Sequence, residues 1–222
     1  MALDGPGSSG KTSVGAAAAA ELDYRFLDTG VVYRAITLLS VMRGIEPTDE
    51  AALVEVVPDL ALAPDAQGNM RRVLIDGTDV TERLHVPEVD RRVSAVSAQP
   101  RVRAALLERQ RDVAAAGRVI LAGRDIGTVV LPDADLKLWL EVSAEERARR
   151  RAAQRGQSLE SPEGQSILDD LRRRDHLDST RETAPLKVAD DAVIVHSDGR
   201  HFEDTVAAVV AIIRGAEQGT SA

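Results

Sequence analysis

The stretch Gly5–Thr12 reads GPGSSGKT, and it decides the fold. It fits the phosphate-binding pattern of Gly, any four residues, Gly, Lys, and Ser or Thr. Backbone N–H groups between such small residues curl around phosphate oxygens, and the start of the following helix favours anions. In this pattern Lys11 reaches the β- and γ-phosphates, and the Thr12 hydroxyl ligates Mg²⁺. The alternative interpretation is a glycine-rich turn that only caps a helix.

The neighbours of this loop favour phosphate binding. Apolar Met1–Leu3 precedes the loop and the helix-forming run Ser13–Leu22 follows it, which predicts strand, loop and helix. A strand normally has about 5–6 residues, whereas only four residues precede Gly5. We therefore expect either a very short first strand or a start codon placed late.

The composition is that of an acidic globular chain with an aliphatic core. The 222 residues suffice for one sizeable core, and 44% are hydrophobic but only 2% aromatic. A net charge of −8 gives no general attraction to nucleic acid. The chain contains no cysteine, no apolar run long enough to span a membrane and no signal peptide before the loop. We expect a cytoplasmic monomer that binds neither a nucleic acid polymer nor a membrane.

Strand and helix patterns alternate along most of the chain. Short apolar runs predict strands at 24–27, 119–121, 136–142 and 192–196. Helical spacing predicts helices that include 13–23, 31–43, 101–116, 145–155, 165–176 and 204–214. This alternation predicts an α/β fold with a parallel β-sheet flanked by helices. Ligands of such folds lie beyond the carboxyl ends of the strands.

Side-chain positions follow from the same spacing in two helices. In 31–43 the apolar residues at helical spacing are Val32, Ala35, Ile36, Leu39 and Met42, and Gly44 ends the helix. In 101–116 the arginines, Arg103 among them, face largely outward. Ser143 and Glu146 form a capping-box-like start for the helix at 145–155.

Residues 58–92 differ in character from the rest of the chain. Alternating residues at 60–63 and 72–75 predict two short strands, and Asp76-Gly77 is a strong turn signal before residues 78–80. We interpret this stretch as a small β-rich insertion within a single domain that spans 1–222.

Three further segments carry candidate chemistry, each with a structural alternative. Arg174, Asp178 and Arg181 share one helix face, as an exposed ladder of ion pairs or as a site for a phosphate and hydroxyls. Gly123-Arg124-Asp125 follows a buried strand, either as a capped turn or as part of a site. Asp28–Arg34 is a strand-to-helix loop in which Tyr33 packs in the core and Arg34 is solvated, or it too lines a site.

Together these segments resemble the bacterial cytidylate kinases, a family of P-loop nucleoside monophosphate (NMP) kinases. The resemblance spans nearly the whole chain, and its specific parts are GRDIGTVV and RDHLDSTR. The matching stretches are DGPGSSGKT (Asp4–Thr12), FLDTGVVYR (Phe26–Arg34), VSAVSAQPRVR (Val93–Arg103), GRDIGTVVLPDADLKLWL (Gly123–Leu140) and RRRDHLDSTRETAPLKVADDAVIV (Arg172–Val195).

The resemblance implies a fold, an activity and a cofactor. The fold would be that of a P-loop NMP kinase, with an NMP-binding insertion at about 58–92 and a short helical lid at about 147–170. The enzyme would transfer the γ-phosphoryl group of ATP to CMP or dCMP, with Mg²⁺, giving ADP and CDP or dCDP. Alternatives are another small-molecule P-loop kinase, for UMP, dTMP or a non-nucleotide acceptor, and a GTP-binding switch. A switch should carry an Asn-Lys-x-Asp motif, which the sequence lacks.

The resemblance also implies a role for each matching residue. Residues that would bind ATP are Gly5, Pro6, Gly7, Ser8, Ser9, Gly10, Lys11, Thr12 and Ser13. Residues that would bind CMP are Ser94, Arg103 and Asp125 at the cytosine, Thr29 near base and phosphate, Arg174 and Asp178 at the ribose, and Arg34, Arg124 and Arg181 at the 5′-phosphate. Lys11 and these three phosphate-binding arginines would be catalytic. Either Arg147 or Arg151 would reach the transferring phosphoryl group from the lid, unless that basic run is a solvated helix face.

One position departs from the family pattern. The family usually has an acidic residue just before Gly123, where this chain has Ala122. A carboxylate there would help to hold the Mg²⁺ shell. Asp4, Asp125 or water would have to replace it, so the departure bears on metal affinity and turnover.

Overall fold

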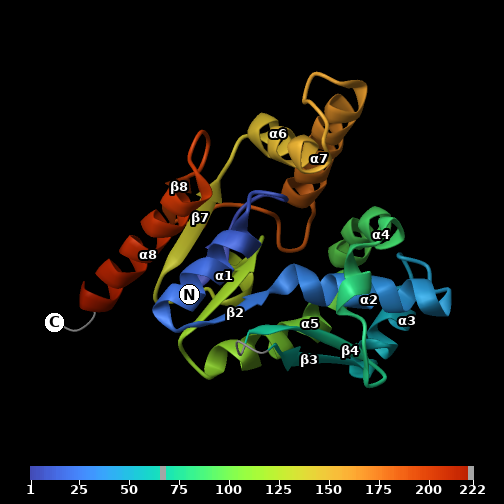
Figure 1. Ribbon diagram of the computed structural model, residues 1–222. Coiled ribbons are helices and arrows are strands. Elements are labelled where there is room, and N and C mark those ends of the chain that lie inside the picture. The colour runs from blue at the N-terminus through green and yellow to red at the C-terminus, as the bar shows by residue number, and fades with distance from the viewer. Residues whose placement is uncertain (66–68, 220–222) are drawn as a thin grey trace. The chain divides into compact units, whose positions relative to one another are not determined.

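The computed structural model describes residues 1–65 and 69–219 (Figure 1). It divides into two compact units, which are described separately. We call Met1–Tyr24 with Gly123–Ala222 the terminal unit, and Arg25–Ala122 the central unit. The single domain and the bounds of the insertion and the lid stay predictions.

Strand–helix alternation produces the expected α/β fold. Five parallel strands have the order β2 (Arg25–Asp28), β6 (Val119–Gly123), β1 (Ala2–Asp4), β7 (Lys137–Glu141) and β8 (Val193–His196). A smaller antiparallel sheet has the order β3 (Leu60–Pro64), β4 (Met70–Ile75) and β5 (Thr78–Asp79). The predicted fold class is therefore confirmed. Within the described ranges, no helix is both long and apolar enough to cross a membrane.

The terminal unit contains the phosphate-binding pattern. β1 pairs in parallel with β7, with Ala2 opposite Lys137, and β7 pairs with β8. The C-terminal helix packs beside α1, and the Tyr24 hydroxyl donates to Glu217 at 2.7 Å. The elements of this unit are β1 (Ala2–Asp4), α1 (Lys11–Leu22), the π-helical turn η3 (Ile126–Val130), β7 (Lys137–Glu141), α6 (Ala144–Gln154), α7 (Pro162–Thr180), β8 (Val193–His196) and α8 (Phe202–Gly219).

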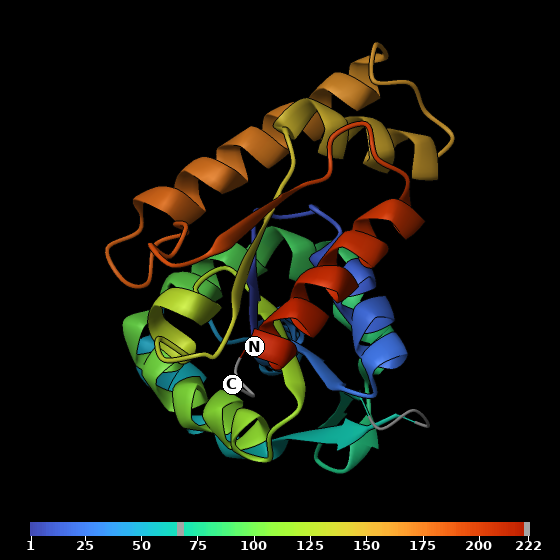
Figure 2. The ribbon, with the colours of Figure 1, turned by 90° about the vertical axis from the view of Figure 1, so that its left-hand side faces the viewer.

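Helices α6 and α7 form a pair with a small core of its own (Figures 1 and 2). That core contains Ala148, Ala152, Ile167, Leu168 and Leu171. Helix α6 begins with the predicted cap, since Ser143 Oγ accepts a hydrogen bond from Glu146 N at 3.2 Å. The loop between the helices ends at Ser161, whose hydroxyl caps α7.

The central unit has the aliphatic core that the composition predicts, and Tyr33 is one of its buried aromatic residues. The Asp76-Gly77 turn has φ values of 49° and 77°, the left-handed pair that a tight hairpin requires. The elements are β2 (Arg25–Asp28), α2 (Thr29–Arg43), α3 (Glu50–Glu55), η1 (Val57–Asp59), β3 (Leu60–Pro64), β4 (Met70–Ile75), β5 (Thr78–Asp79), η2 (Thr81–His85), α4 (Pro87–Ala98), α5 (Pro100–Ala115) and β6 (Val119–Gly123).

Three side chains lie differently from what the helical spacing indicated. Met42 is 49% exposed, although the other apolar residues at helical spacing in α2 are buried. Arg103, predicted outward, is 7% exposed and lies over the ring of Tyr33. Arg181 does not continue the face of α7, because the helix ends at Thr180 and Arg181 has extended backbone angles.

Candidate active site

The phosphate-binding loop runs from the end of β1 into the first turn of α1. Close packing requires its first glycine, since a Cβ on Gly5 would lie 2.6 Å from Leu140 O. Gly10, with φ of 94°, turns the chain into the helix. The side chain of Lys11 arches back over the loop and donates from Nζ to Pro6 O at 2.8 Å. The local geometry is that of a nest of backbone N–H groups at a helix start.

Two of the predicted arginines border this loop. A Cβ built on Gly7 would lie 3.2 Å from an Nη atom of Arg124 and 3.8 Å from Cδ of Arg174. Glycine therefore leaves room for both side chains at the loop. Arg124 follows β6 and Arg174 lies in α7, so two distant segments meet beside Gly7.

Two buried aspartates, Asp125 and Asp178, lie close to the guanidinium groups of Arg124 and Arg181. Arg124 forms an ion pair with Asp178, which is 4% exposed. Arg181 NH2 lies 3.7 Å from Asp125 Oδ1, and its NH1 lies 3.9 Å from Asp178 Oδ1. The structure thus brings together four residues that the resemblance assigns to CMP. Their mixed charges can hold both an anion and hydroxyl or amino groups.

Asp4, at the end of β1, is a third buried carboxylate near the loop. It accepts from Ile126 N at 2.9 Å and from Gly127 N at 2.7 Å, and so joins β1 to η3. Burial raises its pKa from 3.8 to about 6, and the charge of Asp125 adds to this. The two backbone hydrogen bonds and the charge of Lys11 lower the pKa and oppose the shift.

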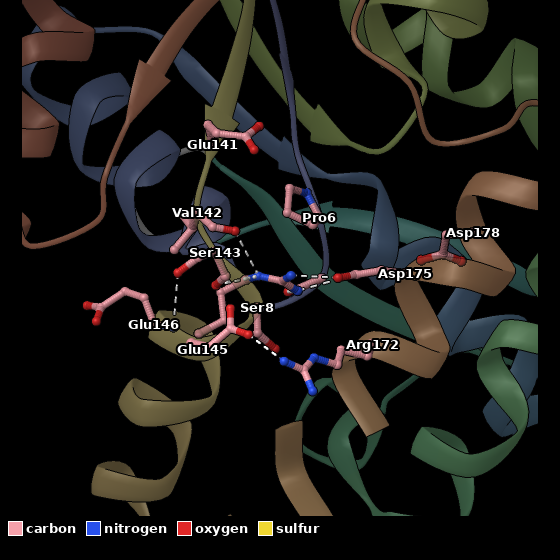
Figure 3. A network of polar contacts seen from close by, with 12 residues as sticks. Pro6, Ser8, Glu141, Val142, Ser143, Glu145, Glu146, Arg172, Asp175 and Asp178 are labelled. Atoms are coloured by element: carbon pink, nitrogen blue, oxygen red, sulfur yellow. Dashed lines mark hydrogen bonds and ion pairs between the residues drawn. The ribbon is translucent and has the colours of Figure 1, made fainter. Parts of the chain in front are cut away.

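The two lid arginines make different contacts with the loop. Arg147 is 3% exposed and donates from NH1 to Gly7 O at 2.9 Å. It also forms an ion pair with Asp175, whose side chain points toward the loop (Figure 3). Arg151, one helical turn later, reaches Ser8 Oγ at 3.3 Å. The structure thus places both arginines of the predicted lid pair against the loop.

The other predicted residues belong to the central unit. Thr29 Oγ1 donates to Ala122 O at 3.0 Å, which fixes the start of α2 against the end of β6. Arg34 donates to Leu84 O at 2.9 Å and pairs with Asp90 at 2.7 Å. Ser94 is half-buried in α4.

Arg103 differs from an ordinary solvated arginine. It donates to Ser97 O at 3.0 Å, and its guanidinium carbon lies 5.2 Å from the ring centroid of Tyr33. A cation over an aromatic face is held in place as well as stabilised. Within the central unit the structure therefore fixes the geometry of Arg34 and of Arg103.

The residues at the loop also fit a magnesium ion bound with ATP. In nucleotide sites Mg²⁺ keeps several waters and takes one or two protein ligands in addition to phosphate oxygens. Thr12 exposes its side chain at the start of α1, and the Asp4 carboxylate lies at the end of β1. Residues 1–65 and 69–219 contain no group of three His, Cys, Asp or Glu side chains that could hold a metal by themselves.

The sequence analysis did not single out Asp175, the partner of Arg147. A signal was available, because Asp175 precedes Asp178 by three positions in a helix and so shares its face. Pairing with an arginine 28 residues away leaves no local pattern, however.

The chain is similar to known proteins over nearly its whole length. The family model described as cytidylate kinase matches residues 1–215. The cytidylate kinase of Rhodococcus jostii (strain RHA1) is 42% identical over 96% of this chain and 93% of its own length. That of Mycobacterium leprae (strain Br4923) is 43% identical over 96% and 95%, respectively. A solved structure entitled "Crystal structure of TT1252 from Thermus thermophilus" gives a TM-score of 0.44 at 19% identity and covers 96% of this chain and 95% of that one.

The family match covers nearly the whole chain and includes the loop, the segment after β6 and the end of α7. Two relatives share more than two fifths of their residues with it over the same span. The chain belongs to the cytidylate kinase family.

Proposed function

We propose that this protein is a cytidylate kinase that transfers the γ-phosphoryl group of ATP to the 5′-phosphate of CMP or dCMP. It is thus a phosphotransferase with a phosphate group as acceptor, and it works in pyrimidine nucleotide metabolism in the cytoplasm. The observation that carries the proposal is the packing of Arg124 and Arg174 against Gly7 of the phosphate-binding loop. Arginines at that place can grip a second phosphate beside the first.

The loop residues bind the donor in this proposal. Backbone N–H groups between Gly5 and Ser13 surround the phosphates, and Lys11 leaves Pro6 O to contact the β- and γ-phosphates. Mg²⁺ bound with ATP would be held by Thr12 and would neutralise phosphate charge. Asp4, Asp125 or water would replace the acidic residue that the family usually has at the position of Ala122.

The acceptor is bound by the paired arginines and aspartates. Arg34, Arg124 and Arg181 hold the 5′-phosphate, and Arg174 and Asp178 hold the ribose. Asp178 accepts from ribose hydroxyls in place of its present partner Arg124. Asp125, Ser94 and Arg103 recognise cytosine, which presents an amino donor beside ring acceptors, with Thr29 near base and phosphate.

The chemistry then depends on positioning and charge. The acceptor phosphate is already ionised, so phosphoryl transfer needs no dedicated general base. The arginines offset the repulsion between two polyanions and stabilise the charge on the transferring group. One of the lid arginines, Arg147 or Arg151, completes this environment, and closure of the lid excludes water.

A coupled assay of ADP release tests the function. ATP, titrated Mg²⁺ and each of CMP, dCMP, UMP and dTMP are supplied in turn, and thermal shifts with each nucleotide are measured in parallel. We expect turnover and stabilisation with CMP and dCMP. Turnover with UMP or dTMP but not with CMP would instead support another P-loop kinase. A response to GDP alone would support a GTP-binding switch, and gel filtration tests the proposed monomer.

A further inference from the structure

The partners of Arg147 suggest a role other than contact with a phosphate. Nε donates to Val142 O at 3.1 Å and to Ser143 O at 3.2 Å. NH1 donates to Gly7 O at 2.9 Å and to Asp175 Oδ1 at 3.2 Å, while NH2 donates to Asp175 Oδ2 at 2.5 Å (Figure 3). A guanidinium has five N–H groups, and these bonds occupy four of them. Most N–H groups of Arg147 therefore donate to atoms of the protein itself.

Its bond to Gly7 acts directly on the phosphate-binding nest. In a planar trans peptide the C=O and the following N–H point in opposite directions. With the Gly7 carbonyl held toward Arg147, the N–H of Ser8 must point away from it. Ser8 has φ of 61°, a conformation that costs an L-residue free energy and persists only when its surroundings enforce it. The guanidinium supplies such a constraint.

Asp175 in turn holds Arg147 in place. Its carboxylate meets the guanidinium through two hydrogen bonds, the fork geometry that fixes both position and rotation. The arginine side chain is 4% exposed and that of Asp175 is 25% exposed. The ion pair therefore lies mostly away from solvent, where screening is weak. A chain of contacts runs from α7 through Asp175 and Arg147 to the loop.

We propose that Arg147 and Asp175 are a positioning pair that presets the phosphate-binding loop, which leaves Arg151 as the lid arginine that meets the transferring phosphoryl group. Arg151 is half-buried and touches the loop through the Ser8 hydroxyl alone among its bonds in the described residues. The assignment rests on the proposed function, because it concerns how that site binds a nucleotide triphosphate.

The chain contains a matched control for this pair. Arg172 and Glu145 also join α7 to α6, and both are 55% exposed (Figure 3). This exposed pair links the same two helices but has no bond to the loop. Breaking the Arg172–Glu145 pair tests whether a weaker contact between α6 and α7 changes nucleotide binding. Breaking the Arg147–Asp175 pair tests in addition the effect of losing the bond to the loop.

The experiment is titration calorimetry with the magnesium complex of AMPPNP, a non-hydrolysable ATP analogue. The variants are Arg147→Ala, Asp175→Asn, their double variant and Arg172→Ala, each with a melting curve that shows it is folded. We expect the first two to weaken analogue binding about 10-fold, as loss of an orienting partner does. The double variant should be little worse than either, because the two residues act through one contact chain. Arg172→Ala should bind the analogue as the unaltered protein does, and CMP affinity should stay within about twofold in every variant.

Asp175→Asn is the decisive variant, because it keeps the shape of the side chain and leaves Arg147 in place. Normal analogue binding by Asp175→Asn, with kcat lost only in Arg147→Ala, would overturn the proposal and assign Arg147 to the phosphoryl group. Equal losses in Arg172→Ala and Arg147→Ala would overturn it in favour of helix tethering.

Arg151 has its own test. Arg151→Ala should lower kcat about 100-fold and leave analogue affinity within about threefold, as expected for an interaction made in the transition state. An unchanged kcat would remove Arg151 from that role. A protein that binds AMPPNP but phosphorylates neither CMP nor dCMP would sink the proposed function, while the calorimetric result for the positioning pair would stand.

Discussion

Asp4 should make the stability of this protein fall as the pH rises through the mildly acidic range. Its carboxylate is 5% exposed and accepts two backbone N–H groups. Burial is the largest cause of a pKa raised from 3.8 to about 6. The native state therefore retains a proton that the unfolded chain has already lost.

The sign and the size follow from this difference. Between pH 4 and pH 6 the native state binds more protons, so the free energy of unfolding decreases as the pH increases. A shift of about 2.2 pKa units corresponds to about 3 kcal/mol in total. About 2 kcal/mol of this falls between pH 4.5 and pH 7.5, because the unfolded carboxyl is already mostly ionised at the lower limit.

Urea denaturation of the protein and of Asp4→Asn at several pH values in this range measures the effect. Asparagine does not titrate, and other titrating groups cancel when the two proteins are compared. Since an amide has one acceptor oxygen for two N–H donors, Asp4→Asn should be less stable at pH 4.5 by about 1–3 kcal/mol. That deficit should shrink by about 2 kcal/mol toward pH 7.5. If the free energies of unfolding of the two proteins changed with pH in parallel, the reasoning would be refuted.

Three further predictions concern single positions. Lys11→Ala should lose activity about 100-fold or more with a near-normal melting curve, because a charge at the phosphates is removed; an active variant would refute the phosphate role. Asp125→Ala should lower kcat/KM for CMP about 10-fold or more while KM for ATP stays within about twofold. Steady-state kinetics test this, and an unaltered kcat/KM would contradict base recognition. Gly164→Ala should destabilise the protein by about 2 kcal/mol, because the new Cβ would lie 2.1 Å from Ser158 O. Gly215→Ala, whose Cβ would meet nothing within 4 Å, is its control in calorimetric melting and should lose no stability.

Local features of the fold could be predicted from the sequence. Gly44 has the left-handed φ of 67° that ends a helix, and Ser143 caps α6 as its spacing with Glu146 indicated. The Asp76-Gly77 turn and the two strands at 60–63 and 72–75 were also predicted. Each depends on backbone preferences within a few residues, which the residue types carry with them.

Side-chain environments were harder to predict than secondary structure. Helical spacing grouped Met42 with the apolar residues of its helix and predicted Arg103 outward, but Met42 is exposed and Arg103 is buried. Spacing tells which side chains share a helix face, but the extent of cover depends on what other elements pack there. Arg103 is buried because the ring of Tyr33, from another helix, lies beneath it.

The sequence by itself determined that a phosphate-binding loop joins a strand to a helix, and its motifs indicated the family. Only the tertiary structure showed which part of the loop each arginine contacts. Arg147 and Arg151 look alike in a basic run, yet one is bound to Gly7, 140 residues away, and the other touches Ser8. Motifs record local backbone requirements, whereas the partner of a charge is set by contacts between segments that lie far apart along the chain.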